Sequence, residues 1–229
     1  MPSPNERPEL QTPDCHASSE ELIVVCVWTK GAKFADPCYV ERLAQSVHRH
    51  LRGPYRFVVL RPKETSYWAK ISLFKDGLFP PGARVLYLDL DSIIVGSLDF
   101  VRDIALGADQ LHMVPSLSYA PHKWNSACLL WRANTLGYLA DVYTESDKHK
   151  YPNGDQQYLY ANAHQVASFD RGLFLSYKRD IRPTQEVPKD ARVIMFHGYP
   201  MPHEVDQPWV HEHWGPAGAA ALSSCKGAL

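Results

Sequence analysis

Apolar residues occur along this chain in short runs that are separated by proline, glycine and polar clusters. The run from Arg84 to Val95 is nearly unbroken and rich in β-branched residues, and two acids interrupt it. Such a run is typical of a strand that is buried on both faces of a parallel sheet. Leu22–Trp28 has the same character, and residues 56–60 and 192–196 are shorter examples. We therefore predict a central strand that ends in two acids, with the other runs as further strands.

Helical patterns separate these strands. Asp36-Pro37 has the form of a helix start. The apolar positions that follow fall on one helical face: Val40, Leu43, Val47 and Leu51. Residues 66–75 predict a second, short helix that ends near Gly77. The order of elements up to Asp91 is therefore β-α-β-α-β, which is half of a Rossmann-like sheet.

The rest of the chain continues this alternation less regularly. We predict helices at 100–106 and 134–145, a helix that begins at Asp155, and strands at 111–114 and 124–131. Residues 1–20 are rich in Pro, Ser and acids, and residues 215–229 in Ala and Gly, so both predict poorly ordered tails. The predicted fold class is α/β, with one domain at 21–214 and a mostly parallel sheet flanked by helices.

Composition narrows the classes of function. Lys and Arg are scattered and the net charge is −1, so no positive field attracts nucleic acid or anionic lipid. The chain lacks a Gly-x-Gly-x-x-Gly motif and a Gly-Lys-Ser/Thr phosphate loop. Dinucleotide enzymes and P-loop NTPases therefore have no support.

Cysteine usage and the apolar runs indicate a location. No apolar run approaches the roughly 20 residues of a transmembrane segment, and the first residues lack a basic stretch followed by an apolar one. The 5 cysteines are an odd number without Cys-x-x-Cys spacing, which suits a reducing compartment. Cys26 and Cys128 lie in apolar runs and are predicted core residues. A cytoplasmic protein is therefore predicted.

Asp89 and Asp91 carry the strongest chemical signal. Side chains along a strand alternate with period two, so both carboxylates point to the same side where the strand leaves the sheet. A divalent cation between them relieves their repulsion, and oxygen ligands suit Mg²⁺ and Mn²⁺. The carboxyl ends of strands in open α/β sheets are also where ligands bind. The alternative is a turn in which one acid caps the following backbone.

Further polar groups stand near the ends of predicted elements. Asn125 precedes an apolar strand, Asp155 follows Gly154 at a helix start, and His197 follows the last strand. Each has a structural alternative, with Asp155 as a helix cap and His197 as a histidine that is hydrogen-bonded within the fold. Lys70 lies on a predicted amphipathic helix and by itself is equally compatible with a solvated side chain.

Together these features resemble the GT-A glycosyltransferases, and most closely glycosyltransferase family 8, the glycogenin-like retaining enzymes. The resemblance covers roughly residues 22–209, in the order D-x-D, Asn-Ser-Ala, Gly-Asp-Gln and His-Gly. It implies a Rossmann-like GT-A domain that moves a sugar from a nucleotide sugar, usually a UDP-sugar, to an acceptor. It also implies that Asp89, Asp91 and His197 bind Mn²⁺, or alternatively Mg²⁺.

The resemblance assigns roles to further residues. Those implied to contact the donor are Val27, Trp28, Thr29, Lys70, Asp89, Leu90, Asn125, Ser126, Asp155, Gln156 and Gly198. Of these, Asp155, Gln156 and Lys70 are the implied catalytic residues. Asp155 would lie near the anomeric carbon, where a retaining reaction uses a carboxylate either as nucleophile or to stabilise the cationic transition state.

One position departs from the family's pattern. The terminal motif of the family reads His-Gly-x-x-Lys-Pro, and Met201 stands here in place of its diphosphate-binding lysine. A thioether carries no positive charge. The residues that could supply the missing positive charge instead are Lys70, Lys33, Arg171 and His203. If the loop after His197 folds over the diphosphate, Met201→Lys is expected to tighten UDP binding.

Other functions stay open from the sequence alone. A non-catalytic sugar-nucleotide-binding protein would explain Met201. A haloacid-dehalogenase-type phosphohydrolase also ends a buried strand in D-x-D, although usually near its N-terminus. The sequence does not indicate whether the acceptor is a saccharide, a lipid-linked group or a protein. It also leaves open whether the protein forms a homo-oligomer. The candidates for an acceptor platform are Trp124, Trp209 and Trp214.

Overall fold

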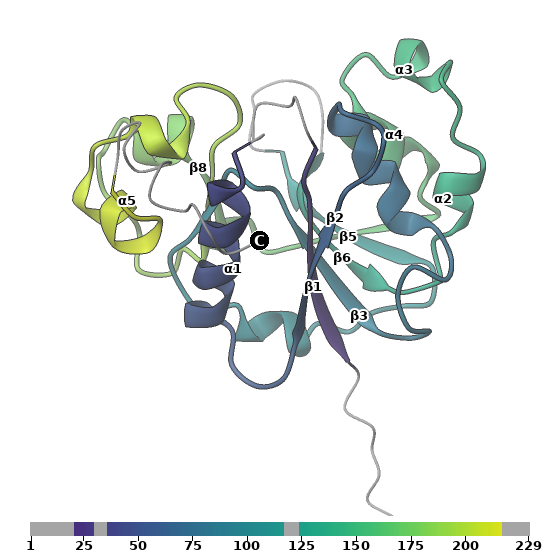
Figure 1. The fold of residues 1–229 in the computed structure, drawn as a ribbon, viewed down its shortest axis with the longest axis horizontal. Coiled ribbons are helices and arrows are strands. Elements are labelled where there is room, and N and C mark those ends of the chain that lie inside the picture. Colours follow the sequence, from purple (N-terminus) through teal and green to yellow (C-terminus); the bar gives the residue numbers. More distant parts are fainter. Residues whose placement is uncertain (1–20, 30–35, 117–123, 217–229) are drawn as a thin grey trace, which may run out of the picture.

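The computed structural model describes residues 21–29, 36–116 and 124–216. The predicted tail at 1–20 lies outside these residues, as does most of the one at 215–229. Figure 1 shows a central sheet with helices on both of its sides. No helix in the described ranges is long and apolar enough to cross a membrane.

A six-stranded sheet forms the centre of the protein, in the order β2-β1-β3-β6-β5-β7. Its strands are β1 (Leu22–Val27), β2 (Arg56–Leu60), β3 (Arg84–Leu88), β5 (Gln110–Pro115), β6 (Trp124–Arg132) and β7 (Gln165–Ser168). Three of its five pairings are parallel, namely β1 with β2, β1 with β3, and β5 with β7. The predicted mostly parallel α/β class is confirmed, and β2-β1-β3 is the predicted half of a Rossmann-like sheet.

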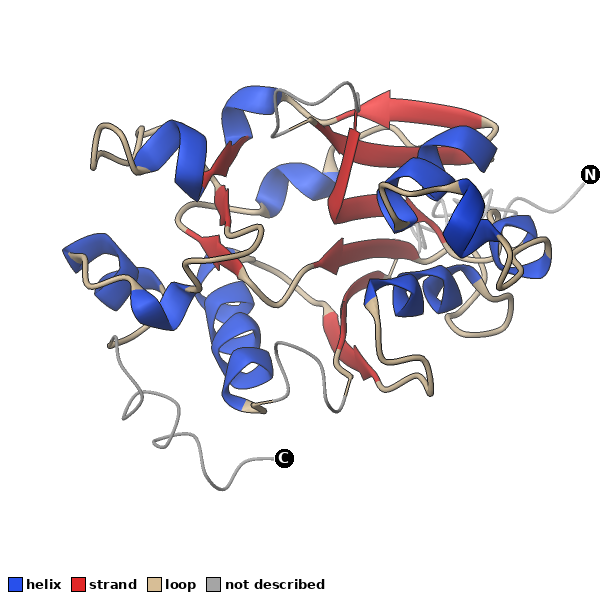
Figure 2. Ribbon diagram, turned by 90° about the horizontal axis from the view of Figure 1, so that it is seen from above, coloured by secondary structure: helices blue, strands red, loops and turns tan. Residues whose placement is uncertain are grey.

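The alternation of side chains along the strands builds two separate cores. Leu22, Val24 and Cys26 of β1 face the layer that contains α1 (Cys38–His50). Ile23 and Val25 face the layer that contains η1 (Tyr67–Phe74), a 3-10 helix, and α4 (Asp155–Asn162). Figure 2 shows the strands between these helices from above. Because both faces of β1 are covered, its sequence is a continuous apolar run rather than an alternating one.

The predicted strand from Arg84 to Val95 divides into two strands. β3 ends at Leu88, and β4 (Ser92–Ile94) belongs to a second sheet with β9 (Val193–Met195) and β8 (Phe174–Ser176). A hydrogen bond from the Ser92 amide to the Asp89 carbonyl (3.1 Å) closes the turn between β3 and β4. Because β4 has only three residues, its apolar pattern does not distinguish it from a continuation of β3.

The prediction of a helix at 134–145 is wrong over most of its length. Only α2 (Tyr138–Asp141) is helical, because Asn134 adopts a left-handed conformation with φ 61°. The Asn134 side chain accepts a hydrogen bond from the Gly77 amide (2.8 Å) and donates one to the Phe79 carbonyl (3.1 Å). These bonds tie the end of β6 to the loop after η1, so the chain turns where a helix was expected.

Several short elements differ from the predictions or escape them. The helix expected at 100–106 is the 3-10 helix η2 (Asp99–Arg102). Not predicted are α3 (Asp147–Lys150), β7, η3 (Arg171–Leu173), β8, the π-helix η4 (Tyr177–Ile181), η5 (Pro202–Glu204) and α5 (Pro208–His213). These elements have three to six residues, too few for a periodic pattern to be recognised.

The cysteines confirm the predicted core positions and leave the predicted reducing location open. Cys26 and Cys128 are free and buried, as predicted for core residues. Burial raises the pKa of the Cys26 thiol to about 12, so this thiol is protonated at neutral pH. Cys38 is disulfide-bonded, which the odd cysteine count did not predict. The reducing, cytoplasmic location therefore stays a prediction.

Candidate active site

The turn after β3 separates the two aspartates from the leucine between them. Asp89 and Asp91 both line cavities, whereas Leu90 is 4% exposed and packs into the core. The Asp89 amide donates a hydrogen bond to the Ala127 carbonyl of β6 (2.8 Å), and the Asp91 carbonyl accepts one from the Phe196 amide at the end of β9 (3.1 Å). The turn is thus held by both sheets.

Lys70 connects the aspartate turn to the start of α4. Its ammonium lies 3.0 Å from Asp89 Oδ1 and 3.3 Å from Asp155 Oδ2, and it donates to Ser126 Oγ (3.1 Å). The side chains of Lys70 and Asp155 are only 10% and 8% exposed, and that of Asp89 is 24% exposed. The Tyr87 hydroxyl also donates to Asp89 Oδ1. The fold thus places one cation between two acids that lie far apart in the chain.

The charge state of Lys70 follows from this environment. Burial lowers the pKa of its ammonium, but the carboxylates of Asp155 and Asp89 raise it by more, so the pKa lies well above its ordinary value. Lys70 is therefore charged at all physiological pH values. The sequence left open whether Lys70 is a site residue or a solvated side chain, and its burial shows that the solvated alternative is wrong.

Asp155 is buried at the first turn of α4 but does not cap the helix. The N-cap is Gly154, with φ 81°, and no side chain makes a capping hydrogen bond there. A Cβ at Gly154 would lie 2.7 Å from the Tyr67 ring, so glycine is required both by the backbone and by this contact. Asp155 Oδ2 accepts a hydrogen bond from Ser126 Oγ (2.6 Å). The carboxylate is therefore held toward β6 and Lys70.

The start of β6 and the first turn of α4 are joined by a second pair of side chains. Asn125 donates from its Nδ2 to Gln156 Oε1 (3.4 Å), and its Oδ1 accepts from the Ala127 amide (2.8 Å). This places the predicted Asn-Ser-Ala and Gly-Asp-Gln segments next to each other.

His197 lies at the end of β9 and forms a hydrogen bond with β8. Its Nε2 is 2.6 Å from Ser176 Oγ, because β8 and β9 are parallel neighbours. Sequence reasoning missed Ser176, since a three-residue strand gives no recognisable pattern. It also missed Tyr87, although the period of a strand puts position 87 on the same side as Asp89.

Two cavities meet at these residues. The β1 cavity, of about 330 Å³, extends to the end of β1, and the α4 cavity, of about 320 Å³, extends to α4 and β9. Both are lined by Tyr67, Lys70, Asp89 and Asp91. The predicted site residues that line one or both are Val27, Thr29, Lys70, Asp89, Asp91, Asn125, Ser126, Asp155, Gln156, His197 and Gly198.

Two predicted donor contacts, Trp28 and Leu90, do not line either cavity. Val27 and Thr29 flank Trp28 and face the β1 cavity. Trp28 packs against the core, with the Arg61 guanidinium 5.0 Å from its ring centre. Side chains alternate along β1 and at its end, which explains why Trp28 points away from the cavity that Val27 and Thr29 line. Leu90 instead lies in the turn between β3 and β4 and packs into the core.

The predicted metal ligands share a cavity without forming a ready metal site. Asp89, Asp91 and His197 all line the α4 cavity, and their carboxylate and imidazole groups suit Mn²⁺ or Mg²⁺. Within residues 21–29, 36–116 and 124–216, however, no three His, Cys, Asp or Glu side chains are gathered as a metal site requires. Asp89 is bound to Lys70, and His197 to Ser176. A metal ion would have to draw these side chains together.

Met201 is not near the cavities, contrary to the expectation from its position in the motif. It is 2% exposed and belongs to the core around α1. Two of the proposed substitutes are engaged elsewhere, Arg171 with Asp180 (2.7 Å) and His203 with the Tyr39 hydroxyl (2.6 Å). Lys33 lies outside the described residues.

A different lysine approaches the His-Gly segment. A Cβ at Gly198 would lie 3.1 Å from the Nζ of Lys178, on η4, and Gly198 itself has φ 87°. Gly198 lines the α4 cavity. Lys178 therefore brings a positive charge to the edge of this cavity from an element that the sequence did not predict.

We expect Met201→Lys to destabilise the protein rather than to tighten nucleotide binding. The substitution places an ammonium in an apolar core, where burial of a charge is costly. The carboxylate of Glu204 is exposed and already accepts a hydrogen bond from the Met201 amide (2.6 Å). A urea titration is expected to show a loss of about 2–4 kcal/mol in the free energy of unfolding. Met201→Leu, which keeps the core apolar, is the control. A lysine variant as stable as the leucine variant would contradict the burial of Met201.

The three tryptophans do not form an acceptor platform. Trp214 is 4% exposed, with its ring centre 5.4 Å from that of Tyr39. Trp209 lies beside Phe196 (6.3 Å), and Trp124 beside Tyr160 (6.0 Å). Each ring has a different neighbour on a different element.

Comparisons with known proteins place the fold. No protein-family model and no curated protein matches the sequence. Among solved structures, the glycosyltransferase GlyE of Streptococcus pneumoniae TIGR4 superposes with a TM-score of 0.64, over 89% of this chain and 63% of GlyE, at 16% identity. The fold is that of the GT-A glycosyltransferases. The predicted GT-A fold is therefore confirmed.

Two further glycosyltransferases have a similar fold. The galactosyltransferase LgtC, solved with donor and acceptor sugar analogues, has a TM-score of 0.63 over 90% of this chain and 97% of its own, at 14% identity. A glycosyltransferase involved in glycosylation of the major capsid of PBCV-1 has a TM-score of 0.54 over 76% of this chain and 93% of its own, at 10% identity. This chain spans 63% of GlyE's length, and its placement in glycosyltransferase family 8 stays a prediction.

Proposed function

We propose that this protein transfers a glycosyl group from a nucleotide sugar, most suitably a UDP-sugar, to an acceptor. The observation that carries the proposal is the buried Lys70 between Asp89 and Asp155, at the junction of two cavities in a GT-A fold. Buried charged groups in a cavity are typical of functional sites, and cavities at strand ends are where α/β proteins bind ligands. The β1 cavity suits the nucleoside and the α4 cavity the sugar.

The side chains of the α4 cavity supply what glycosyl transfer needs. Positive charge grows at the anomeric carbon as the bond to the diphosphate breaks, and a fixed carboxylate stabilises it. Asp155 is held for this role by Ser126 and Lys70. Asn125 and Gln156, joined to each other, offer amide groups to the hydroxyls of the sugar. Retention is the stereochemistry that the resemblance suggests.

A divalent metal ion is part of the proposal. Asp89, Asp91 and His197 would hold it together with oxygens of the donor's diphosphate, which supply the ligands that the protein alone does not gather. When bound, the ion neutralises charge on the departing diphosphate. Lys178 is proposed to add the positive charge that Met201 cannot supply, because its Nζ lies beside Gly198 at the rim of the α4 cavity.

Nucleotide binding tests this proposal. In a thermal-shift panel of nucleoside diphosphates, we expect UDP to raise the melting temperature most, and more so with Mn²⁺, since a ligand selective for the native state stabilises it by mass action. By calorimetry, Asp91→Asn is expected to lower the Mn²⁺-dependent affinity for UDP at least tenfold. The control is Asp103→Asn, an exposed acid outside both cavities. An unchanged Mn²⁺-dependent affinity in Asp91→Asn would remove the aspartate turn from the site.

The role of Lys178 has its own test. We expect Lys178→Gln to weaken UDP binding roughly ten- to hundredfold, which corresponds to about 1.5–3 kcal/mol for one charge-assisted contact to phosphate. The salt dependence of binding should also decrease. Lys189→Gln, on the exposed segment before β9, is the control. Equal affinities in the two variants would show that Lys178 does not reach the diphosphate.

A further inference from the structure

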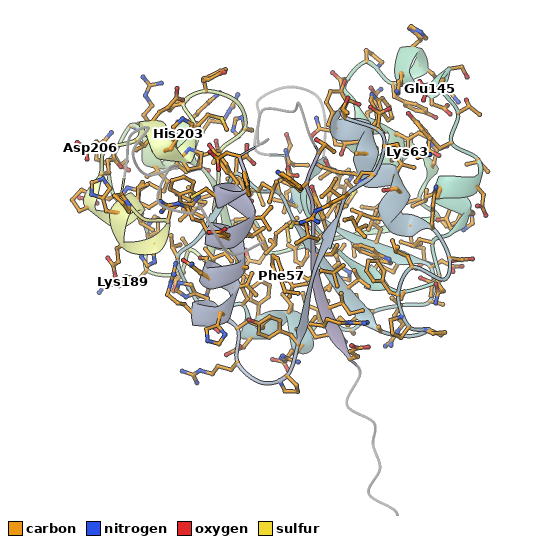
Figure 3. The ribbon with its side chains drawn as sticks, viewed as in Figure 1. Phe57, Lys63, Glu145, Lys189, His203 and Asp206 are labelled. Carbon is orange, nitrogen blue, oxygen red and sulfur yellow. The ribbon has the colours of Figure 1, made fainter. Side chains whose placement is uncertain are left out.

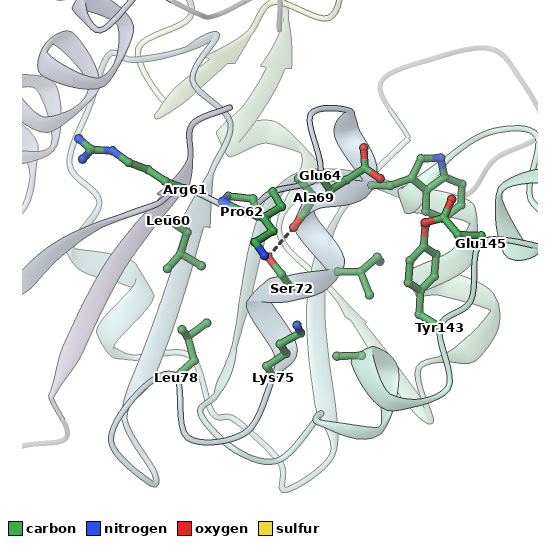
Figure 4. A pocket seen from close by; sticks show the side chains of 14 residues that line it. Leu60, Arg61, Pro62, Glu64, Ala69, Ser72, Lys75, Leu78, Tyr143 and Glu145 are labelled. Carbon is green, nitrogen blue, oxygen red and sulfur yellow. Dashed lines mark hydrogen bonds between the residues drawn. The ribbon is translucent and has the colours of Figure 1, made fainter. Parts of the chain in front are cut away.

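A cavity larger than the β1 and α4 cavities lies outside the site discussed so far. It has a volume of about 650 Å³ and is enclosed by η1, the end of β2 and the segment after α2 (Figure 4). Ala69 of η1 lines both this η1 cavity and the β1 cavity. The two cavities therefore adjoin across η1. Lys70 of η1 faces the aspartates, whereas Ser72 of η1 and Lys75, the residue after it, line the η1 cavity.

The floor of the η1 cavity is apolar. Leu60 of β2 and Leu78 face each other across it, and Tyr143 closes one side (Figure 4). Leu78 is 38% exposed, so part of this apolar surface contacts water. The Tyr143 ring is stacked on Trp68, with 5.5 Å between the ring centres, so this wall presents an aromatic surface. A cavity of this size with an apolar floor is within the range of small-molecule sites.

The charges around the η1 cavity leave an excess of positive charge. Its two acids, Glu64 and Glu145, are both paired with Lys148, at 2.6 and 2.8 Å. Lys63 and Lys75 also line the cavity and have no ion-pair partner within the described parts of the chain. Figure 4 shows Lys75 directed into the cavity from the end of η1. Two ammonium groups above an apolar floor suit a ligand with an anionic head and an apolar chain.

We infer that the η1 cavity binds a single-chain amphipathic anion, with the chain on Leu60 and Leu78 and a phosphate head between Lys63 and Lys75. A phosphate is favoured because it carries up to two charges and several acceptor oxygens for two unpaired ammonium groups. The inference does not depend on the proposed glycosyl transfer, because none of the residues that carry it lines the β1 or α4 cavity.

Calorimetry with dodecyl phosphate, below its micellar concentration, tests the inference. We expect saturable binding of one molecule per chain. Dodecyl maltoside has the same chain with a neutral head, and inorganic phosphate has the head without the chain, so both are expected to bind at least tenfold more weakly. Equal affinity for the maltoside would show that the lysines play no part, and equal affinity for inorganic phosphate would show that the chain plays none. Either result overturns the inference.

Variants locate the binding. Lys63→Gln combined with Lys75→Gln is expected to lower the affinity for dodecyl phosphate at least tenfold, and so is Leu78→Asp, which puts a negative charge on an exposed part of the floor. Lys150→Gln combined with Lys189→Gln removes two exposed lysines outside the cavity and should have no effect. Figure 3 shows Lys63 and Glu145 on one side of the molecule and Lys189 on the other. Wild-type affinity in the Lys63/Lys75 variant, or displacement of dodecyl phosphate by UDP, would overturn the assignment.

Discussion

Lys70→Met is expected to lower the free energy of unfolding by about 3–5 kcal/mol, because removing one partner of a buried ion pair leaves an uncompensated charge. Asp155 is 8% exposed on its side chain and Asp89 is 24% exposed, and the ammonium of Lys70 lies within 3.3 Å of both. Without it, two carboxylates face each other across a cavity that water reaches only in part. Urea denaturation of the two proteins measures the difference.

Lys148→Met is the matched control for this result. Lys148 also has two carboxylate partners, Glu64 and Glu145, but its side chain is 26% exposed and that of Glu145 is 79% exposed. Ion pairs exposed in this way contribute about 0–1 kcal/mol, so the control should lose no more than that. If both variants lose the same amount, Lys70 is not the buried centre of a charged network, and the geometry at the D-x-D turn is wrong.

Asp155→Asn is expected to lower turnover of the sugar donor by a factor of about 10²–10³ while UDP binding stays nearly unchanged. The reason is that the negative charge of the carboxylate acts on charge that develops at the anomeric carbon only in the transition state. Asparagine keeps the shape of the side chain and an oxygen that accepts from Ser126. Steady-state kinetics with UDP-sugars, together with UDP calorimetry, separates the two quantities.

The control for Asp155 is an aspartate that does cap a helix. Asp170 precedes η3 and accepts a hydrogen bond from the Gly172 amide (2.9 Å), and Asp170→Asn should leave turnover within a few-fold of wild type. A kcat for Asp155→Asn in the same range would make Asp155 a structural residue only. UDP binding without turnover of any UDP-sugar in the wild-type protein would instead support the non-catalytic sugar-nucleotide-binding alternative.

The sequence by itself determined the β2-β1-β3 half of the central sheet and the position of the two aspartates after β3. The runs at β1 and at residues 85–88 of β3 are apolar because both faces of the sheet are covered, and this shows in the pattern without knowledge of what covers them. The same local logic predicted that Asp89 and Asp91 lie on one side, that Cys26 and Cys128 are core residues, and that helices start near Asp36 and Asp155. All of these depend on neighbours within a few residues.

The tertiary structure alone decided which of these groups meet. Lys70 and Asp155 are 85 positions apart, and only the packing of η1 and α4 on the same face of the sheet brings them together. Met201 is an example of a predicted contact that does not form. Its position in the motif predicted that it lies near the diphosphate, whereas the loop after β9 places it in the core. Lys178 reaches Gly198 through a strand and a π-helix too short to be recognised. Contacts of this kind depend on how short elements pack across the chain, which a local pattern of residues does not encode.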